Sequence, residues 1–129
     1  KTSNLYTWQP DKNSMKRDFR VFLDDILERN GRIEEYTKGI NKEEFLKDVS
    51  IQDAVIRRFE IIGEAVKNIP QDIKNKHSDI PWKEIAGTRD IIIHEYFGVN
   101  LERIWKTAKE DILPFKEQIE GVLKESSLL

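Results

Sequence analysis

The chain has 129 residues, a formal net charge of −2, a hydrophobic fraction of 38% and a charged fraction of 36%. This length suits one domain with its own core, and the absence of cysteine excludes disulfides and thiolate metal sites. There is no apolar run of about eighteen residues to span a membrane and no recognisable secretory signal peptide, so a cytoplasmic protein is expected. The sequence pI of about 5.8 excludes a strongly basic nucleic-acid binder, and any contact with nucleic acid would depend on a local patch.

The first fourteen residues are polar and show no periodicity, and Met15 is the only methionine. Two interpretations of residues 1–14 stay open: a segment derived from cloning, or a natural N-terminal extension that docks on the domain. The functional argument therefore concerns residues 15–129, which are expected to form one helical domain.

A long amphipathic helix is predicted over roughly Met15 to Thr37, because apolar residues recur there at steps of three and four. Gly39 is a plausible stop. The charged residues of this segment are expected to form a solvated face: Glu28, Arg29, Arg32, Glu34 and Glu35.

Asn41 is a predicted N-cap with Glu44 at the capping-box position, and a short helix could follow to Lys47. Ser50, with Asp53 three residues on, is the next predicted N-cap. A second long helix ends before Pro70. Its apolar stripe is Val55, Phe59, Ile62, Val66 and Ile69.

The segment from Pro70 to Pro81 is polar and turn-like, with room for one short helix. Pro81 suits the first turn of a further helix, which Gly98 should end. Asn100 is expected to cap the last helix, and Pro114 should kink that helix or split it in two. The fold class is therefore all-α, a helical bundle of four main helices plus short helices.

The most distinctive segment runs from Gly87 to Tyr96, where an apolar run is bounded by Arg-Asp and His-Glu-Tyr. Asp90 and His94 are four residues apart and share a helix face, so the carboxylate can fix the imidazole tautomer. Arg89 and His94 are about 140° apart around an ideal helix and flank a surface rather than stack.

These residue types point to chemistry at phosphate, because arginine offers a planar fork to phosphate oxygens and histidine moves protons near neutrality. Cleavage of RNA by its own 2′-hydroxyl needs a base for that hydroxyl and an acid for the leaving oxygen. His94 alone does not obviously supply both the base and the acid, and the other histidine, His77, lies in the polar linker. A two-fold dimer with a shared cleft is the economical solution.

Simpler interpretations stay open at this point. Arg89 could be a surface cation, Asp90 and His94 a solvated helix pair worth ~0.3–0.5 kcal/mol, and Tyr96 an aromatic at the edge of the core. The case for metal binding is weaker still, because one histidine and scattered carboxylates do not make a metal-ligand motif such as His-Glu-x-x-His. The site prediction contains no metal and no cofactor.

The pattern Arg89, four residues, His94, one residue, Tyr96 resembles the R-x4-H-x-Y signature of HepT-like proteins in the HEPN superfamily. Asp90 fits the polar position that commonly follows the arginine. The segments 82–87 (WKEIAG) and 58–65 (RFEIIGEA) also resemble that family, and the resemblance covers roughly Met15 to Glu125.

The resemblance implies a helical, dimeric, metal-independent endoribonuclease that acts as the toxin of a prokaryotic toxin–antitoxin pair. Arg89 and His94 would be catalytic in a cleft at the dimer interface, and Asp90 would orient His94. The partner would be a minimal nucleotidyltransferase antitoxin that transfers AMP to Tyr96. The added charge and bulk would block the cleft against RNA.

A second hypothesis is a noncatalytic partner of a minimal nucleotidyltransferase, using the same cleft to bind a nucleotide or substrate. Toxicity on expression alone, relieved by the partner, would favour the enzyme. A homodimer is a separate prediction, supported by a surplus of large apolar side chains for a short bundle: Phe19, Phe22, Trp82, Trp105 and Phe115.

Overall fold

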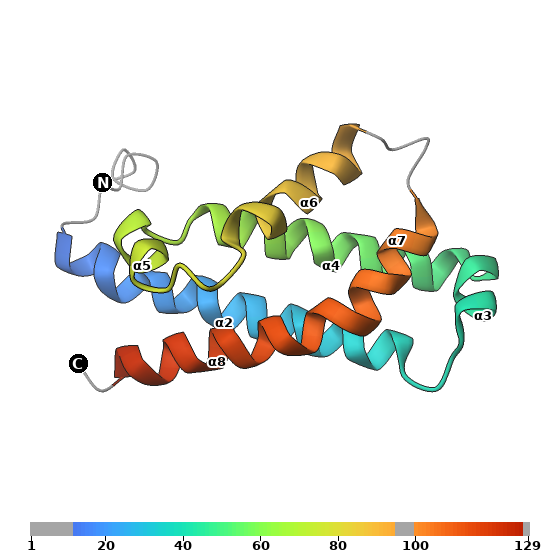
Figure 1. Cartoon of the computed structure of the whole chain (residues 1–129), viewed down its shortest axis with the longest axis horizontal. Helices are drawn as coiled ribbons and strands as arrows, with labels where there is room; N and C mark the ends of the chain where they lie inside the picture. Colours follow the sequence, from blue (N-terminus) through green and yellow to red (C-terminus); the bar gives the residue numbers. More distant parts are fainter. Residues whose placement is uncertain (1–11, 95–99, 128–129) are drawn as a thin grey trace, which may run out of the picture.

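In the computed structural model, the backbone is described for residues 12–94 and 100–127, and the side chains for residues 19–88 and 100–126. Within these ranges every regular element is a helix, which confirms the all-α prediction. The elements in chain order are α2 (Lys12–Thr37), α3 (Lys42–Lys47), α4 (Val49–Lys67), α5 (Gln71–Lys76), α6 (Trp82–His94), α7 (Leu101–Lys106), the π-helical turn η2 (Thr107–Asp111) and α8 (Ile112–Ser127) (Figure 1).

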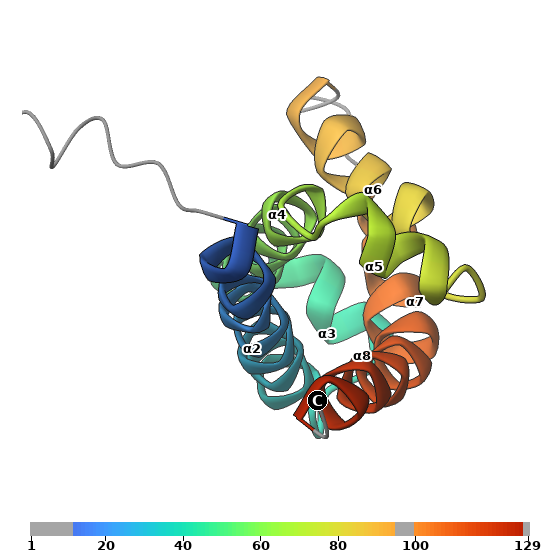
Figure 2. The same ribbon diagram turned by 90° about the vertical axis from the view of Figure 1, so that its left-hand side faces the viewer.

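Helix α2 is the centre of the bundle and packs against α4, α8 and η2. It runs in the opposite direction to both α4 and α8 (Figure 1). Figure 2, which looks along the bundle, shows α2, α4 and α8 around a common interior. Helix α3 contacts α4 and α7 at one end of the bundle, whereas α6 packs mainly on α4. None of the helices in the described ranges has both the length and the apolarity needed to cross a membrane.

The core side of α2 is a regular stripe of fully buried residues. Leu23, Ile26, Asn30, Ile33 and Thr37 follow one another at steps of three and four, and each is at most 1% exposed. Burial of each aliphatic member stabilises the fold by roughly 1.5–3 kcal/mol relative to exposure. Two members are polar: the Thr37 hydroxyl donates to Ile33 O at 2.8 Å, whereas neither polar atom of the Asn30 amide has a hydrogen-bond partner among the described residues.

The predicted start of α3 is confirmed in detail. The backbone N–H of Glu44 donates to Asn41 Oδ1 at 2.8 Å, and the N–H of Asn41 donates to Glu44 Oε1 at 3.2 Å. This is the reciprocal capping box. Gly39 has φ of +77°, the left-handed conformation in which a side chain is strained, so it ends the first long helix as expected.

Two predicted helix boundaries were wrong. Helix α4 begins at Val49, and its N-cap is Asp48, whose carboxylate accepts from the N–H of Ile51 at 3.1 Å. Asp48 also ends α3, because its own N–H donates to Phe45 O. One residue therefore joins the two helices, and Ser50 falls inside the first turn of α4. Helix α2 begins at Lys12, ahead of the predicted Met15.

The last helix is interrupted as expected, but ahead of Pro114 and not at it, because Pro114 lies inside α8 and the interruption is the wide turn η2. The N–H of Ile112 donates to Thr107 O, five residues back, which makes η2 a π-helical turn. Proline has no N–H for the carbonyl of Glu110, and its ring crowds that group. The π turn contains Glu110, so the chain accommodates Pro114 by widening there and then continues as α8.

Candidate active site

The backbone of α6 contains three of the four predicted site residues. Arg89, Asp90 and His94 belong to the last turns of this helix, so the helical spacing on which their prediction rests is present. Their side chains lie outside the described part of the chain. Tyr96 and the predicted helix end at Gly98 lie in residues 95–99, which are also outside it.

The two ends of α6 are held differently. At its start, Trp82 is buried and its indole Nε1–H donates to His77 O at 3.0 Å. At its other end, the helix points away from α2 and α8 in both views (Figures 1 and 2). An anchored start and a projecting end present the segment with Arg89 and His94 at the periphery of the bundle.

A groove of about 1260 Å³ lies beside α6. Glu84, Ile85 and Thr88 of α6 line one side, and α7, η2 and the start of α8 line the other. Phe59 and Ile62 of α4 contribute apolar side chains from the core. Thr88, the last described side chain of α6, directly precedes Arg89 in the chain, so the described lining ends next to the predicted motif in sequence.

The described lining of this groove is balanced in charge. Its cations are matched in number by its carboxylates, and one pair, Lys42 Nζ to Glu102 Oε2, is in contact at 3.5 Å. A nucleic-acid channel is normally basic, whereas an apolar floor with a mixed polar rim is typical of a protein interface. The charged members are Lys42, Arg103, Lys106, Lys109, Glu84, Glu102, Glu110 and Asp111.

The wall opposite α6 is locked to the rest of the bundle. Trp105 packs on Phe45 with ring centroids 5.3 Å apart, and Lys109 Nζ lies 5.2 Å from the Trp105 centroid. The same ammonium group donates to Thr37 O at 3.3 Å, near the C-terminal end of α2, where a cation is favourable. Helix α7 is therefore held by α3, and η2 by α2, so both elements of this wall are anchored to the bundle.

His77 follows α5 and does not join His94. Its carbonyl accepts from Trp82, whereas His94 is twelve residues further along α6, or ~18 Å at the rise of an α-helix. The His77 ring instead lies 3.5 Å from a carboxylate oxygen of Glu125 in α8. Within one chain, His77 cannot supply a second proton-transfer group to a site at His94.

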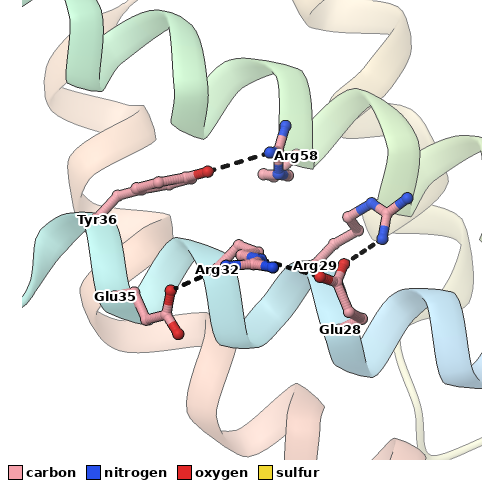
Figure 3. Close-up of polar contacts among 6 residues, drawn as sticks. All are labelled: Glu28, Arg29, Arg32, Glu35, Tyr36 and Arg58. Carbon is pink, nitrogen blue, oxygen red and sulfur yellow. Dashed lines mark hydrogen bonds and ion pairs between the residues drawn. The ribbon is translucent and has the colours of Figure 1, made fainter.

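One polar cluster was not singled out by the sequence. Arg58 of α4 donates from Nη2 to the hydroxyl of Tyr36 of α2 at 3.1 Å, and its guanidinium carbon lies 5.6 Å from the Tyr36 ring centroid (Figure 3). Arg58 entered the sequence argument only as the first residue of a family-like segment. Its contact with Tyr36, 22 positions away, gives no periodic signal in the sequence.

Metal ligation receives no support from the described side chains, among which no three His, Asp or Glu groups gather closely enough to hold an ion. The side chains of the predicted site are not part of that set.

Comparisons with known proteins agree on one family. The model of the HepT-like ribonuclease family matches residues 26–122. A protein from Thermococcus cleftensis, named a probable ribonuclease HepT, is 52% identical over 110 residues, which cover 85% of this chain and all of that relative. A Methanocaldococcus jannaschii protein, provisionally named an RNase, is 48% identical over 85% of this chain and 91% of its own length.

A second M. jannaschii protein is named a gamma-glutamylcyclotransferase and, provisionally, an RNase. It is 48% identical over 86% of this chain, but the matched region is only 50% of that relative, so the chain spans half its length. No solved structure gives a significant match. The match of the family model to most of the chain, together with relatives near 50% identity, establishes that this chain belongs to the HepT-like ribonuclease family.

Proposed function

We propose that this protein is a metal-independent endoribonuclease whose reaction centre is formed by Arg89, Asp90 and His94. The observation that carries the proposal is the R-x4-H-x-Y motif of a HepT-like chain at the projecting end of α6. Arg89 stabilises charge on the phosphate, His94 transfers the proton, and Asp90 holds the imidazole in one tautomer.

The reaction forms a bond from the 2′-oxygen of RNA to phosphorus and breaks the bond from phosphorus to the 5′-oxygen. A base removes the proton of the 2′-hydroxyl, and an acid returns a proton to the leaving 5′-oxygen. His94 of one chain performs one of these transfers. Since His77 is held at the far end of α6, the second group comes from another molecule.

The second molecule is a copy of the same chain in a two-fold dimer. The groove beside α6 is the receiving surface, because it has an apolar floor, a balanced rim and an anchored far wall. A two-fold axis at this groove brings the projecting α6 of each copy close to the other. Both copies of Arg89 and His94 then share one cleft.

The biological role that we propose is that of the toxin in a prokaryotic toxin–antitoxin pair that acts in the cytoplasm. Its antitoxin is a minimal nucleotidyltransferase that transfers AMP to the hydroxyl of Tyr96. The new phosphodiester places negative charge two residues from His94, where it repels the RNA backbone and fills the cleft.

Cleavage of RNA in the presence of EDTA tests the enzyme. The wild-type protein should cut, and His94→Ala should lose cleavage while it keeps its circular dichroism spectrum and its dimeric state. Cutting by His94→Ala at the wild-type rate would refute the assignment of the reaction centre. If the wild type cuts no RNA, shows no toxicity and binds AMP at micromolar concentration, the noncatalytic binding partner is the better description.

A further inference from the structure

The contact between Arg58 and Tyr36 joins α4 to α2 at the seam where the two helices pack (Figure 3). Both residues are half-buried. The guanidinium lies over the aromatic ring and donates one hydrogen bond to the hydroxyl. Arginine has five N–H donors, so this contact uses only a small part of its capacity.

The nearby carboxylates on α2 are occupied by other arginines. Glu28 accepts from Arg32 at 2.9 Å and also from Arg29, and Glu35 accepts from Arg32 at 3.4 Å (Figure 3). The hydrogen bonds from Arg32 and then Arg29 lower the pKa of the Glu28 carboxyl. Among the described residues, no carboxylate forms an ion pair with Arg58.

Arg58 is therefore a half-buried cation without a counter-charge in the described chain. Its Nε–H is buried and has no hydrogen-bond acceptor there. Burying a cation in this way costs free energy unless something pairs with it. The Tyr36 hydroxyl accepts from Arg58, which leaves the hydroxyl hydrogen as a further donor. The cluster offers donors and no acceptor, which suits an oxyanion.

We propose that Arg58 and Tyr36 form a phosphate-binding site that holds a backbone phosphate of the RNA substrate away from the scissile bond. The planar guanidinium takes two phosphate oxygens, and the Tyr36 hydroxyl donates to one of them. Arg29, 28% exposed and on the same seam, is paired with Glu28, so Arg58 is the cation of this seam that has no carboxylate partner among the described side chains. The site gives an acidic chain one local phosphate contact, and it rests on the proposed RNase function.

Binding of a short fluorescein-labelled single-stranded RNA to the full-length chain tests the site by anisotropy. The His94→Ala background prevents cleavage during the titration. Arg58→Gln should weaken binding by about tenfold and reduce the slope of log K against log salt by about one. Arg57→Gln is the matched control, because it removes the same charge from the neighbouring, exposed position of α4. It should change the affinity by less than about twofold.

Tyr36→Phe provides a second variant if Arg58→Gln fails to fold, since it removes one hydroxyl and keeps the ring. It should weaken binding by about threefold. Unchanged affinity in the folded Arg58 or Tyr36 variants overturns the site, as does an equal loss in Arg57→Gln. Unchanged RNA affinity is also the result expected if Arg58 binds a carboxylate of a partner protein instead of RNA. A parallel titration with AMP distinguishes an RNA phosphate from the phosphate of a free nucleotide. If Arg58→Gln weakens the binding of AMP but leaves the affinity for RNA unchanged, the assignment to RNA is wrong.

Cleavage by the wild-type chain separates this site from the proposed function. If the wild type cuts RNA but the Arg58 variants bind it normally, only the phosphate site is wrong. If no form cuts RNA while binding still depends on Arg58, the RNase proposal fails and the phosphate site stands.

Discussion

The indole N–H of Trp82 donates to the backbone carbonyl of His77 at 3.0 Å, and this bond ties the linker histidine to the start of α6. His94 is the last described residue of the same helix. The two histidines of the chain thus lie at opposite ends of the described part of α6. A composite site built from two chains is the arrangement that this geometry favours.

The position of His77 predicts that it takes no part in catalysis. His77→Ala should keep RNA cleavage within about threefold of the wild type, a barrier change of ~0.65 kcal/mol. The bond to Trp82 comes from the backbone and survives the substitution, and the lost contact with Glu125 is partly exposed. Initial rates in EDTA measure the effect. A loss comparable to that of His94→Ala, in a folded dimer, would contradict a site that excludes His77.

The dimer should depend on the groove beside α6. Thr88 lines that groove, so Thr88→Glu should weaken dimerisation by about tenfold or more, ~1.4 kcal/mol, because it buries a charge in the interface. Lys83→Glu is the control, since Lys83 is exposed on the same helix and does not line the groove. Sedimentation equilibrium at several concentrations measures both. Dimers of equal stability in the two variants would place the interface elsewhere.

Tyr96→Phe should separate catalysis from neutralisation. The variant should keep RNase activity within about tenfold, a barrier change of ~1.4 kcal/mol, because the hydroxyl transfers no proton in the proposed reaction. It should also escape inactivation by the nucleotidyltransferase. Mass spectrometry after co-expression should find added AMP on the wild type and none on the variant. An adduct on Tyr36 or Tyr6 would reassign the acceptor and leave the RNase proposal open.

Asn30 should limit the stability of the fold. It is fully buried, and neither atom of its amide has a hydrogen-bond partner among the described residues. Asn30→Leu should raise the free energy of unfolding by about 1–2 kcal/mol, because it removes two unsatisfied polar atoms at similar volume. Urea denaturation at one fixed protein concentration measures the change.

Gln52→Leu is the contrasting variant. Gln52 is also buried, but its Nε2 donates to Phe45 O at 2.9 Å. Loss of that bond should lower the free energy of unfolding by about 1 kcal/mol. If both variants shift the free energy of unfolding in the same direction, the unpaired amide of Asn30 does not destabilise the fold as inferred here.

The sequence alone determined the features that depend on a few consecutive residues. The capping box of Asn41 and Glu44 and the cap at Asn100 arise from bonds over three positions, and the stop at Gly39 from the backbone conformation of one residue. The family followed from the same kind of signal, short motifs of neighbouring residues at 58–65, 82–87 and 89–96. The N-cap prediction at Ser50 was wrong because Asp48, two positions earlier, offers a carboxylate to the same turn and also closes α3.

Only the tertiary structure decided which distant residues meet. The groove joins Thr88 of α6 to side chains of α7 and η2, and Arg58 meets Tyr36 across the seam of α4 and α2. No periodicity encodes these pairs, because they depend on how whole helices pack through summed burial rather than on any local spacing. The separation of His77 from His94, in contrast, is local in origin, because it follows from the bond between Trp82 and His77 and from the length of α6. Because His77 cannot reach His94 within one chain, the second proton-transfer group is expected from a second chain.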